Sequence, residues 1–237
     1  MTDSSEAAIL PYISLDRIFS LQDEVFERTR RENADRFEFA KECLELAINA
    51  RQKEDTLIGQ AKENFQALEL YQNDAVSTLI NSLKLCLYGC KSDALMLLRL
   101  AVENIAVLSY VVDKKMYKTA KSKRGLKSQL KFDEIVKEIP DGTRIEELWG
   151  RLSEVACHTL PARLANSTFK IGDQVFPRCG VALDPDGCKL TLGEIDRASL
   201  YLLRILRAFY QQHQELHLEA FVKRVGELDS KIESLRT

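Results

Sequence analysis

The sequence predicts an all-α protein, an antiparallel helical bundle with a small β-hairpin inserted near residues 168–192. Two observations predict this class. The 237 residues include only five prolines and ten glycines, and no proline lies between Leu15 and Tyr117. Apolar residues also recur at steps of three and four along most of the chain, which is the period of an amphipathic helix.

Composition places the chain among ordinary globular proteins. Charged residues make up 30% and hydrophobic residues 45% of it, well outside the range of disordered chains. The formal net charge of −2 does not indicate a protein that coats nucleic acid or an anionic membrane nonspecifically. We expect one helical domain over residues 14–237 after a flexible tail at residues 1–13. The N-terminus has no signal-peptide pattern, so we expect a cytoplasmic protein with free cysteines.

The first two helices are expected from apolar periodicity. One starts near Ser14, and the second starts near Arg36, where apolar residues recur on one face. The polar run at residues 51–55 either interrupts the second helix or forms a solvated turn. The periodicity then resumes and leads into the next helix.

A helical hairpin is expected in the middle of the chain, with helices over 74–88 and 94–117. Gly89 suits the left-handed position just after the first of these helices. Ser92 or Asp93 then caps the second helix. The two helices therefore fold back on each other in antiparallel fashion.

The second half of the chain mixes short helices with the only β signal. Helices are expected over 131–139 and 144–160. A β-hairpin is expected between 181–183 and 189–192, with its turn at Asp186-Gly187. Further candidate strands are residues 169–171 and 174–176.

Two amphipathic helices close the chain. One begins at a capping pattern, Thr191-Leu-Gly-Glu194. The other, over 214–235, repeats apolar residues at alternating steps of four and three, the seam of a short coiled coil. This seam either packs against its own domain or forms a homodimer, which we expect. Its residues are Phe221, Val225, Leu228, Ile232 and Leu235.

The most apolar segment, residues 94–112, carries Arg99 and Glu103 one helical turn apart, where they can pair. Its length barely suffices to span a membrane, and Arg99, Glu103 and Asn104 would face hydrocarbon. A buried central helix is therefore expected. We expect both side chains to be largely buried and within salt-bridge distance of each other or of His158. Ionised groups among aliphatic residues are costly to bury unless they are paired, so the two residues form either a structural ion pair or part of a site.

Three segments carry a resemblance to a known family. Residues 81–89 end in a glycine turn, residues 94–103 read Ala-Leu-Met-Leu-Leu-Arg-Leu-Ala-Val-Glu, and residues 152–158 end in histidine. Together they resemble an uncharacterised bacterial all-helical family with a Leu-Leu-Arg-x-x-x-Glu helix. That family in turn is similar to the HEPN superfamily of helical nucleotide-binding and ribonuclease domains, whose motif is an arginine four to six residues ahead of a histidine.

The resemblance implies metal-independent RNA cleavage in a defence or stress system. His158 would act as general acid or base, while Arg151 or Arg99 would stabilise charge on phosphorus. Leu152 departs from the motif, in which a polar residue follows the arginine. The alternative role of His158 is that of a helix C-terminal cap or a buried hydrogen-bonding residue. The candidate catalytic residues are Arg99, Glu103, Arg151 and His158.

A basic run at residues 114–131 contains no acidic residue. It either binds RNA phosphates, with Tyr117 available for stacking, or forms a solvated loop. The candidate nucleic-acid-binding residues are Lys114, Lys115, Lys118, Lys121, Lys123, Arg124 and Lys127. The alternative function is a noncatalytic interaction module whose basic loop meets an acidic protein partner.

No metal or cofactor site is expected. His213 and His217 lie one turn apart, but the order of residues differs from the His-Glu-x-x-His motif of zinc proteases. The cysteines lack the paired Cys-x-x-Cys spacing of zinc sites.

Overall fold

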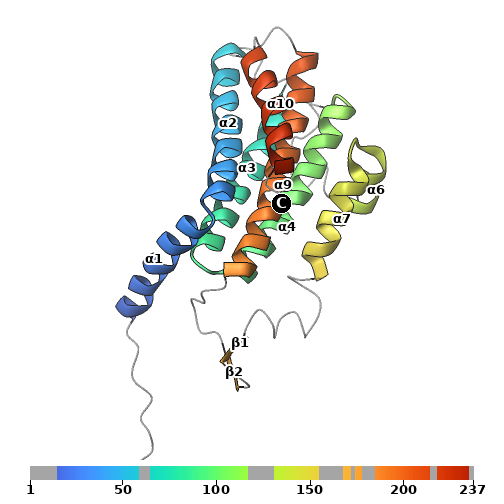
Figure 1. The fold of residues 1–237 in the computed structure, drawn as a ribbon. Coiled ribbons are helices and arrows are strands. Elements are labelled where there is room, and N and C mark those ends of the chain that lie inside the picture. The colour runs from blue at the N-terminus through green and yellow to red at the C-terminus, as the bar shows by residue number, and fades with distance from the viewer. Residues whose placement is uncertain are drawn as a thin grey trace, which may run out of the picture.

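A computed structural model describes residues 15–58, 65–116, 131–154, 168–171, 174–177, 185–213 and 218–234. Within these ranges the chain is predominantly helical, which confirms the all-α class (Figure 1). The helices are α1 (Leu15–Glu32), α2 (Ala34–Ile58), α3 (Gln66–Leu87), α4 (Lys91–Asp113), α6 (Phe132–Glu138), α7 (Gly142–Ser153), α9 (Pro185–Gln212) and α10 (Glu219–Ser234).

The first two helices follow one another with a single residue between them. Asn33 separates α1 from α2, and its side-chain amide donates to the carbonyl of Thr29 at 3.0 Å. α1 leans away from the end of the bundle, whereas α2 runs along its length (Figure 1). The polar run at residues 51–55 is helical, so the expected interruption of α2 is wrong.

The expected helical hairpin is confirmed in α3 and α4. Gly89 takes the left-handed conformation with φ 77°, and the Cys90 amide donates to the Leu85 carbonyl at 2.8 Å. This is the hydrogen bond that closes a Schellman turn. The expected cap of α4 is wrong, because the helix begins at Lys91 and its N-cap is Cys90.

α4 is the central helix of the bundle. Thirteen of its 23 residues are buried, among them Leu98, Ile105 and Leu108. Among the described helices it alone is long and apolar enough to cross a membrane, and 67% of its most apolar window is buried by the rest of the protein. Burial on several sides explains why this segment is apolar almost all round.

Two short strands, β1 (Thr168–Ile171) and β2 (Gln174–Pro177), pair in antiparallel register. The hairpin expected between 181–183 and 189–192 is not present as predicted. Residues 189–192 belong to α9, which begins at Pro185. Proline is favoured in the first turn of a helix, and at Pro185 this start signal prevails over the turn signal of Asp186-Gly187.

The last two helices pack on α2 (Figure 1). Four residues of the expected coiled-coil seam, Phe221, Val225, Leu228 and Ile232, are buried within the chain, and Leu235 lies outside the described residues. The seam therefore packs inside the protein. The expected homodimer stays a prediction and would need another surface.

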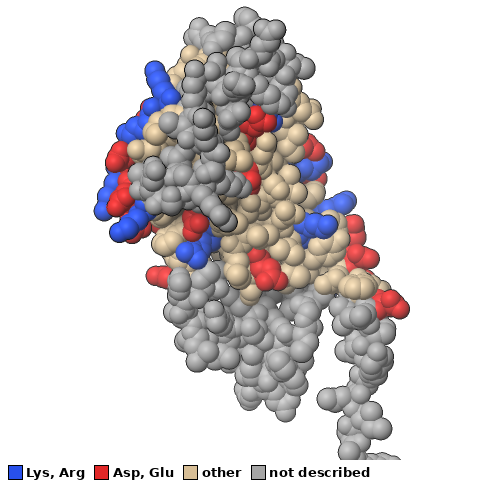
Figure 2. Space-filling view, turned by 180° about the vertical axis from the view of Figure 1, so that it is seen from behind, with Lys and Arg blue, Asp and Glu red and all other residues tan. Residues whose placement is uncertain are grey.

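Seen from behind, uncharged side chains cover much of the described surface, and charged side chains gather near its edges (Figure 2). Exposed apolar residues on α3 and α4 include Ile80, Met96 and Leu100.

Candidate functional site: a buried ion pair beneath a basic hollow

A buried ion pair joins α2 to α9. Arg36 Nη1 donates to Asp196 Oδ2 at 3.0 Å, and the side chains are 20% and 1% exposed, respectively. Asp196 Oδ1 has no hydrogen-bond partner in the described part of the chain. A carboxylate that is buried this deeply with only half of its acceptors satisfied is costly, and such groups concentrate at functional sites.

Burial raises the pKa of the Asp196 carboxyl to about 7, even though Arg36 and Arg197 oppose the shift. Desolvation disfavours the charged form of an acid, and a neighbouring cation favours it. Here desolvation has the larger effect. Asp196 can therefore exchange a proton near neutral pH.

The local sequence explains how α9 presents this carboxylate. Asp196 occupies the helical register of the buried residues Leu192, Ser199 and Leu203, so the helix carries it into the core. Gly193 lies one turn earlier, and a Cβ there would come within 3.2 Å of Arg36 Nη1. The small residue thus leaves room for the guanidinium.

A hollow of about 510 Å³ opens beside the ion pair. We call it the α2–α9 hollow. Three of its lining residues are cationic (Arg36, Lys189 and Arg197) and two are acidic (Glu194 and Asp196). The remaining lining residues are Leu190, Gly193 and Ile232.

Glu194 pairs with two arginines at the edge of the hollow. Its Oε2 accepts from Arg197 Nη1 at 2.8 Å and from Arg151 Nη2 at 3.3 Å. Arg151 comes from α7, so this carboxylate links two helices and holds both guanidinium groups. The rim therefore carries several N–H donors and a net positive charge. Such a rim suits an anion with several oxygens, such as a phosphate.

Arg99 and Glu103 form a second cluster between α4 and α7. Arg99 Nη2 lies 3.6 Å from Glu103 Oε1, and the side chains are 25% and 29% exposed. Trp149 Nε1 donates to Glu103 Oε1 at 3.0 Å, and the Arg99 guanidinium lies 4.8 Å from the centre of the Trp149 ring. Phe132 of α6 stacks on Trp149, with ring centroids 4.8 Å apart. The cluster ties three helices together.

Of the three candidate catalytic residues that the structure describes, Arg99 and Glu103 belong to one cluster and Arg151 belongs to another. Arg99 and Glu103 contact Trp149, whereas Arg151 contacts Glu194. His158 lies outside the described residues. Sequence reasoning missed Arg36, Lys189, Asp196 and Arg197, although an aspartate in the apolar register of a helix was a visible signal for one of them.

Only the two ends of the basic run, residues 114–116 and residue 131, are described. Lys114 lies 3.1 Å from Asp113 and 3.5 Å from Glu138, and both carboxylates raise the pKa of its ammonium group. Lys115 is exposed with a left-handed backbone. The other candidate nucleic-acid-binding residues, Lys118, Lys121, Lys123, Arg124 and Lys127, lie outside the described residues.

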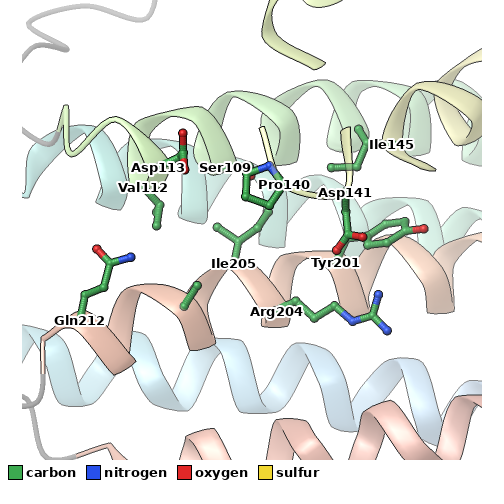
Figure 3. A pocket seen from close by; sticks show the side chains of 11 residues that line it. Ser109, Val112, Asp113, Pro140, Asp141, Ile145, Tyr201, Arg204, Ile205 and Gln212 are labelled. Atoms are coloured by element: carbon green, nitrogen blue, oxygen red, sulfur yellow. The ribbon is translucent and has the colours of Figure 1, made fainter. Parts of the chain in front are cut away.

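A separate cavity of about 130 Å³ lies between α4, the turn before α7, and α9 (Figure 3). Its floor is apolar, with Val112, Ile145 and Ile205, and its rim carries Asp113 and Arg204. Arg204 is already paired with Asp229 at 2.7 Å. The cavity is smaller than the α2–α9 hollow and has one lining cation against three, so it is the weaker candidate for binding an anion.

No group of three or more potential metal ligands occurs among the described residues. His213 packs against the rings of Phe209 and Phe65, and His217 lies outside the described residues. Comparison of the chain with models of protein families, with curated proteins and with solved structures finds no match.

Proposed function

We propose that the chain binds the phosphate groups of RNA or of a nucleotide in the α2–α9 hollow. One observation carries the proposal: Arg36, Lys189 and Arg197 line a single hollow of about 510 Å³. Phosphate oxygens are well matched by guanidinium and ammonium donors. The ion pairs of Arg36 with Asp196 and of Arg197 with Glu194 hold the two guanidinium groups in place before a ligand arrives.

Fluorescence anisotropy with a labelled single-stranded RNA tests this proposal. Lys189→Ala removes a cation from the hollow with little effect on the core, because the residue is exposed. We expect a loss of affinity of about threefold to tenfold. The slope of log affinity against log salt concentration should decrease by about 1, the contribution of one phosphate contact. The matched control is Lys137→Ala, which removes an exposed lysine from α6. Equal effects of the two variants, or salt-insensitive binding, would contradict the proposal.

The resemblance to HEPN domains extends the proposal to metal-independent ribonuclease activity. His158 would then move the proton of the ribose hydroxyl or of the leaving oxygen, and Arg151 would stabilise charge on phosphorus. Arg151 reaches the rim of the hollow through Glu194, which supports a role near a bound phosphate. Purified protein with mixed RNA should cleave it in the presence of a chelator, and His158→Ala should abolish the cleavage. Binding without cleavage would leave a noncatalytic RNA-binding protein.

A second candidate function is a noncatalytic interaction module in which the Arg99–Glu103 pair is structural. The contacts of both residues with Trp149 favour it. In this case an acidic protein partner would meet the basic run at residues 114–131. Absence of RNA binding in the anisotropy experiment, with the fold intact, would favour this candidate.

A further inference from the structure

Arg36 has two roles if an anion enters the α2–α9 hollow. It donates to Asp196 Oδ2 at 3.0 Å, and it also lines the hollow. Asp196 is the less exposed partner, with 1% of its side chain accessible against 20% for Arg36. The guanidinium is therefore the part of the pair that is more accessible to a ligand, and the carboxylate of Asp196 also borders the hollow.

An anion at Arg36 places a second negative charge next to a carboxylate that is already poorly solvated. Like charges at short distance disfavour the ionised form of an acid, and burial adds to the effect. The repulsion between the two negative charges is relieved when Asp196 takes up one proton and becomes neutral. Oδ1 has no partner among the described residues, so it is the oxygen that can carry this proton.

The charged and titratable neighbours of Asp196 come from three helices. Arg36 and Cys43 interact with it from α2, Cys86 interacts with it from α3, and Arg197 is the next residue of α9. Burial raises the pKa of the Cys43 thiol, and a hydrogen bond with Cys188 together with burial raises the pKa of the Cys86 thiol, so both stay neutral near pH 7. Lys231 of α10 and Glu42 of α2 act on Cys43. Asp196 is thus the buried group of this set that can change charge near neutral pH.

We infer that binding of a phosphate-type anion in the α2–α9 hollow is coupled to the uptake of one proton by Asp196. This inference rests on the proposed function and adds its regulation: the site binds more tightly as the pH falls through the neutral range. Burial supports it, since it raises the pKa of Asp196 to about 7 before any ligand is bound.

Isothermal titration calorimetry of the full chain tests the coupling. The probes are a uridine dinucleotide and inorganic sulfate, because neither changes its charge between about pH 6 and pH 8.5. The association constant should fall by about tenfold per pH unit above pH 7 and level off below it. Titrations at one pH in two buffers with different heats of ionisation should show uptake of a fraction of a proton that increases toward alkaline pH.

Two variants separate the possible causes. Asp196→Asn keeps the shape of the side chain and removes its titration, so binding should become independent of pH, without proton uptake. Glu194→Gln removes a carboxylate from the rim and keeps Asp196, so the pH dependence should persist. If Asp196→Asn does not fold, the absence of proton uptake by the unaltered chain would still overturn the coupling.

The outcomes distinguish the two proposals. If neither probe binds at any pH, phosphate binding in the hollow fails and the coupling fails with it. If the probes bind with the same affinity across the pH range and release or take up no proton, the coupling is wrong and the proposed function stands. A pH dependence that survives in Asp196→Asn would also overturn the coupling, because another group would then be responsible.

Discussion

Two arginine–carboxylate pairs lie in different parts of the bundle and differ mainly in their exposure to water. Arg36–Asp196 joins α2 to α9, and its carboxylate is 1% exposed. Arg99–Glu103 lies on α4, and each side chain is about a quarter exposed, at 25% and 29%. The second carboxylate has a Trp149 N–H as an additional donor, whereas the first has an oxygen without a partner in the described residues.

The difference shows that pairing alone does not determine the chemistry of a buried charge. At Asp196 desolvation exceeds the attraction of Arg36, and the pKa rises to about 7. At Glu103 the contacts with Arg99 and Trp149 satisfy the carboxylate while water still reaches it. The first pair therefore has the properties of a proton-sensitive site, and the second has those of a structural contact between helices.

The largest effect is expected from Arg36→Met, which leaves Asp196 without its ion-pair partner. At about pH 8.5 the loss in the free energy of unfolding should reach roughly 3–5 kcal/mol, the cost of an uncompensated buried charge. At about pH 5 the carboxyl group is neutral, so the loss should be much smaller. Urea unfolding at the two pH values measures both. An equal loss at each pH would show that Arg36 acts through packing and not through the charge of Asp196.

The next largest effect is the pH dependence of stability. In the unfolded chain Asp196 has its ordinary pKa of 3.8, and in the folded chain the pKa is about 7. Between these values the folded state binds the additional proton, so stability falls as the pH rises through this window. From about pH 5 to pH 8 the unaltered chain should lose roughly 2–3 kcal/mol relative to Asp196→Asn. Parallel stability profiles would contradict the assignment.

A smaller effect is expected at the second pair. Because both side chains reach solvent, replacing one of them should cost about 1–2 kcal/mol, less than the cost of exposing a fully buried charge. A double-mutant cycle with Arg99→Met and Trp149→Leu should give a coupling of about 0.5–1 kcal/mol from the guanidinium over the ring. If the free-energy changes of the two single variants add up in the double variant, the cation–π contact does not contribute to stability.

The smallest expected effect concerns the rim of the hollow. Glu194→Gln removes the carboxylate that neutralises Arg151 and Arg197, so RNA affinity should increase by about twofold to fivefold. Glu146→Gln, which changes an exposed carboxylate on α7, is the matched control. A decrease in affinity would mean that Glu194 positions the arginines more than it neutralises them.

Much of the fold was predictable because local signals and tertiary packing agree. Gly89 specified the turn between α3 and α4, and the apolar segment at residues 94–112 became the central helix. The start of α9 was not predicted, because Asp186-Gly187 is also a hairpin signal and only the packing of Cys188 and Leu192 against the bundle decides between the two. Short segments with competing signals depend most on tertiary context.

The candidate site was predictable only in part. The close spacing of Arg99 and Glu103 made their pair visible, and the structure confirms that they lie within ion-pair distance. Arg36 and Asp196 are 160 residues apart, and no periodicity within one helix links them. Only the packing of α2 against α9 brings them together. Asp196 could still have been noticed as the charged residue in an otherwise apolar helical stripe.

The titration of the Asp196 carboxyl group tests the central claim most directly. Carbon-13 NMR of the side-chain carboxyl groups can follow it, with the signal identified by its absence in Asp196→Asn. We predict a midpoint near pH 7, well above the ordinary value of 3.8. A midpoint below about pH 5 would contradict the account, because Asp196 would then be ionised throughout the neutral range and could not couple a proton to anion binding.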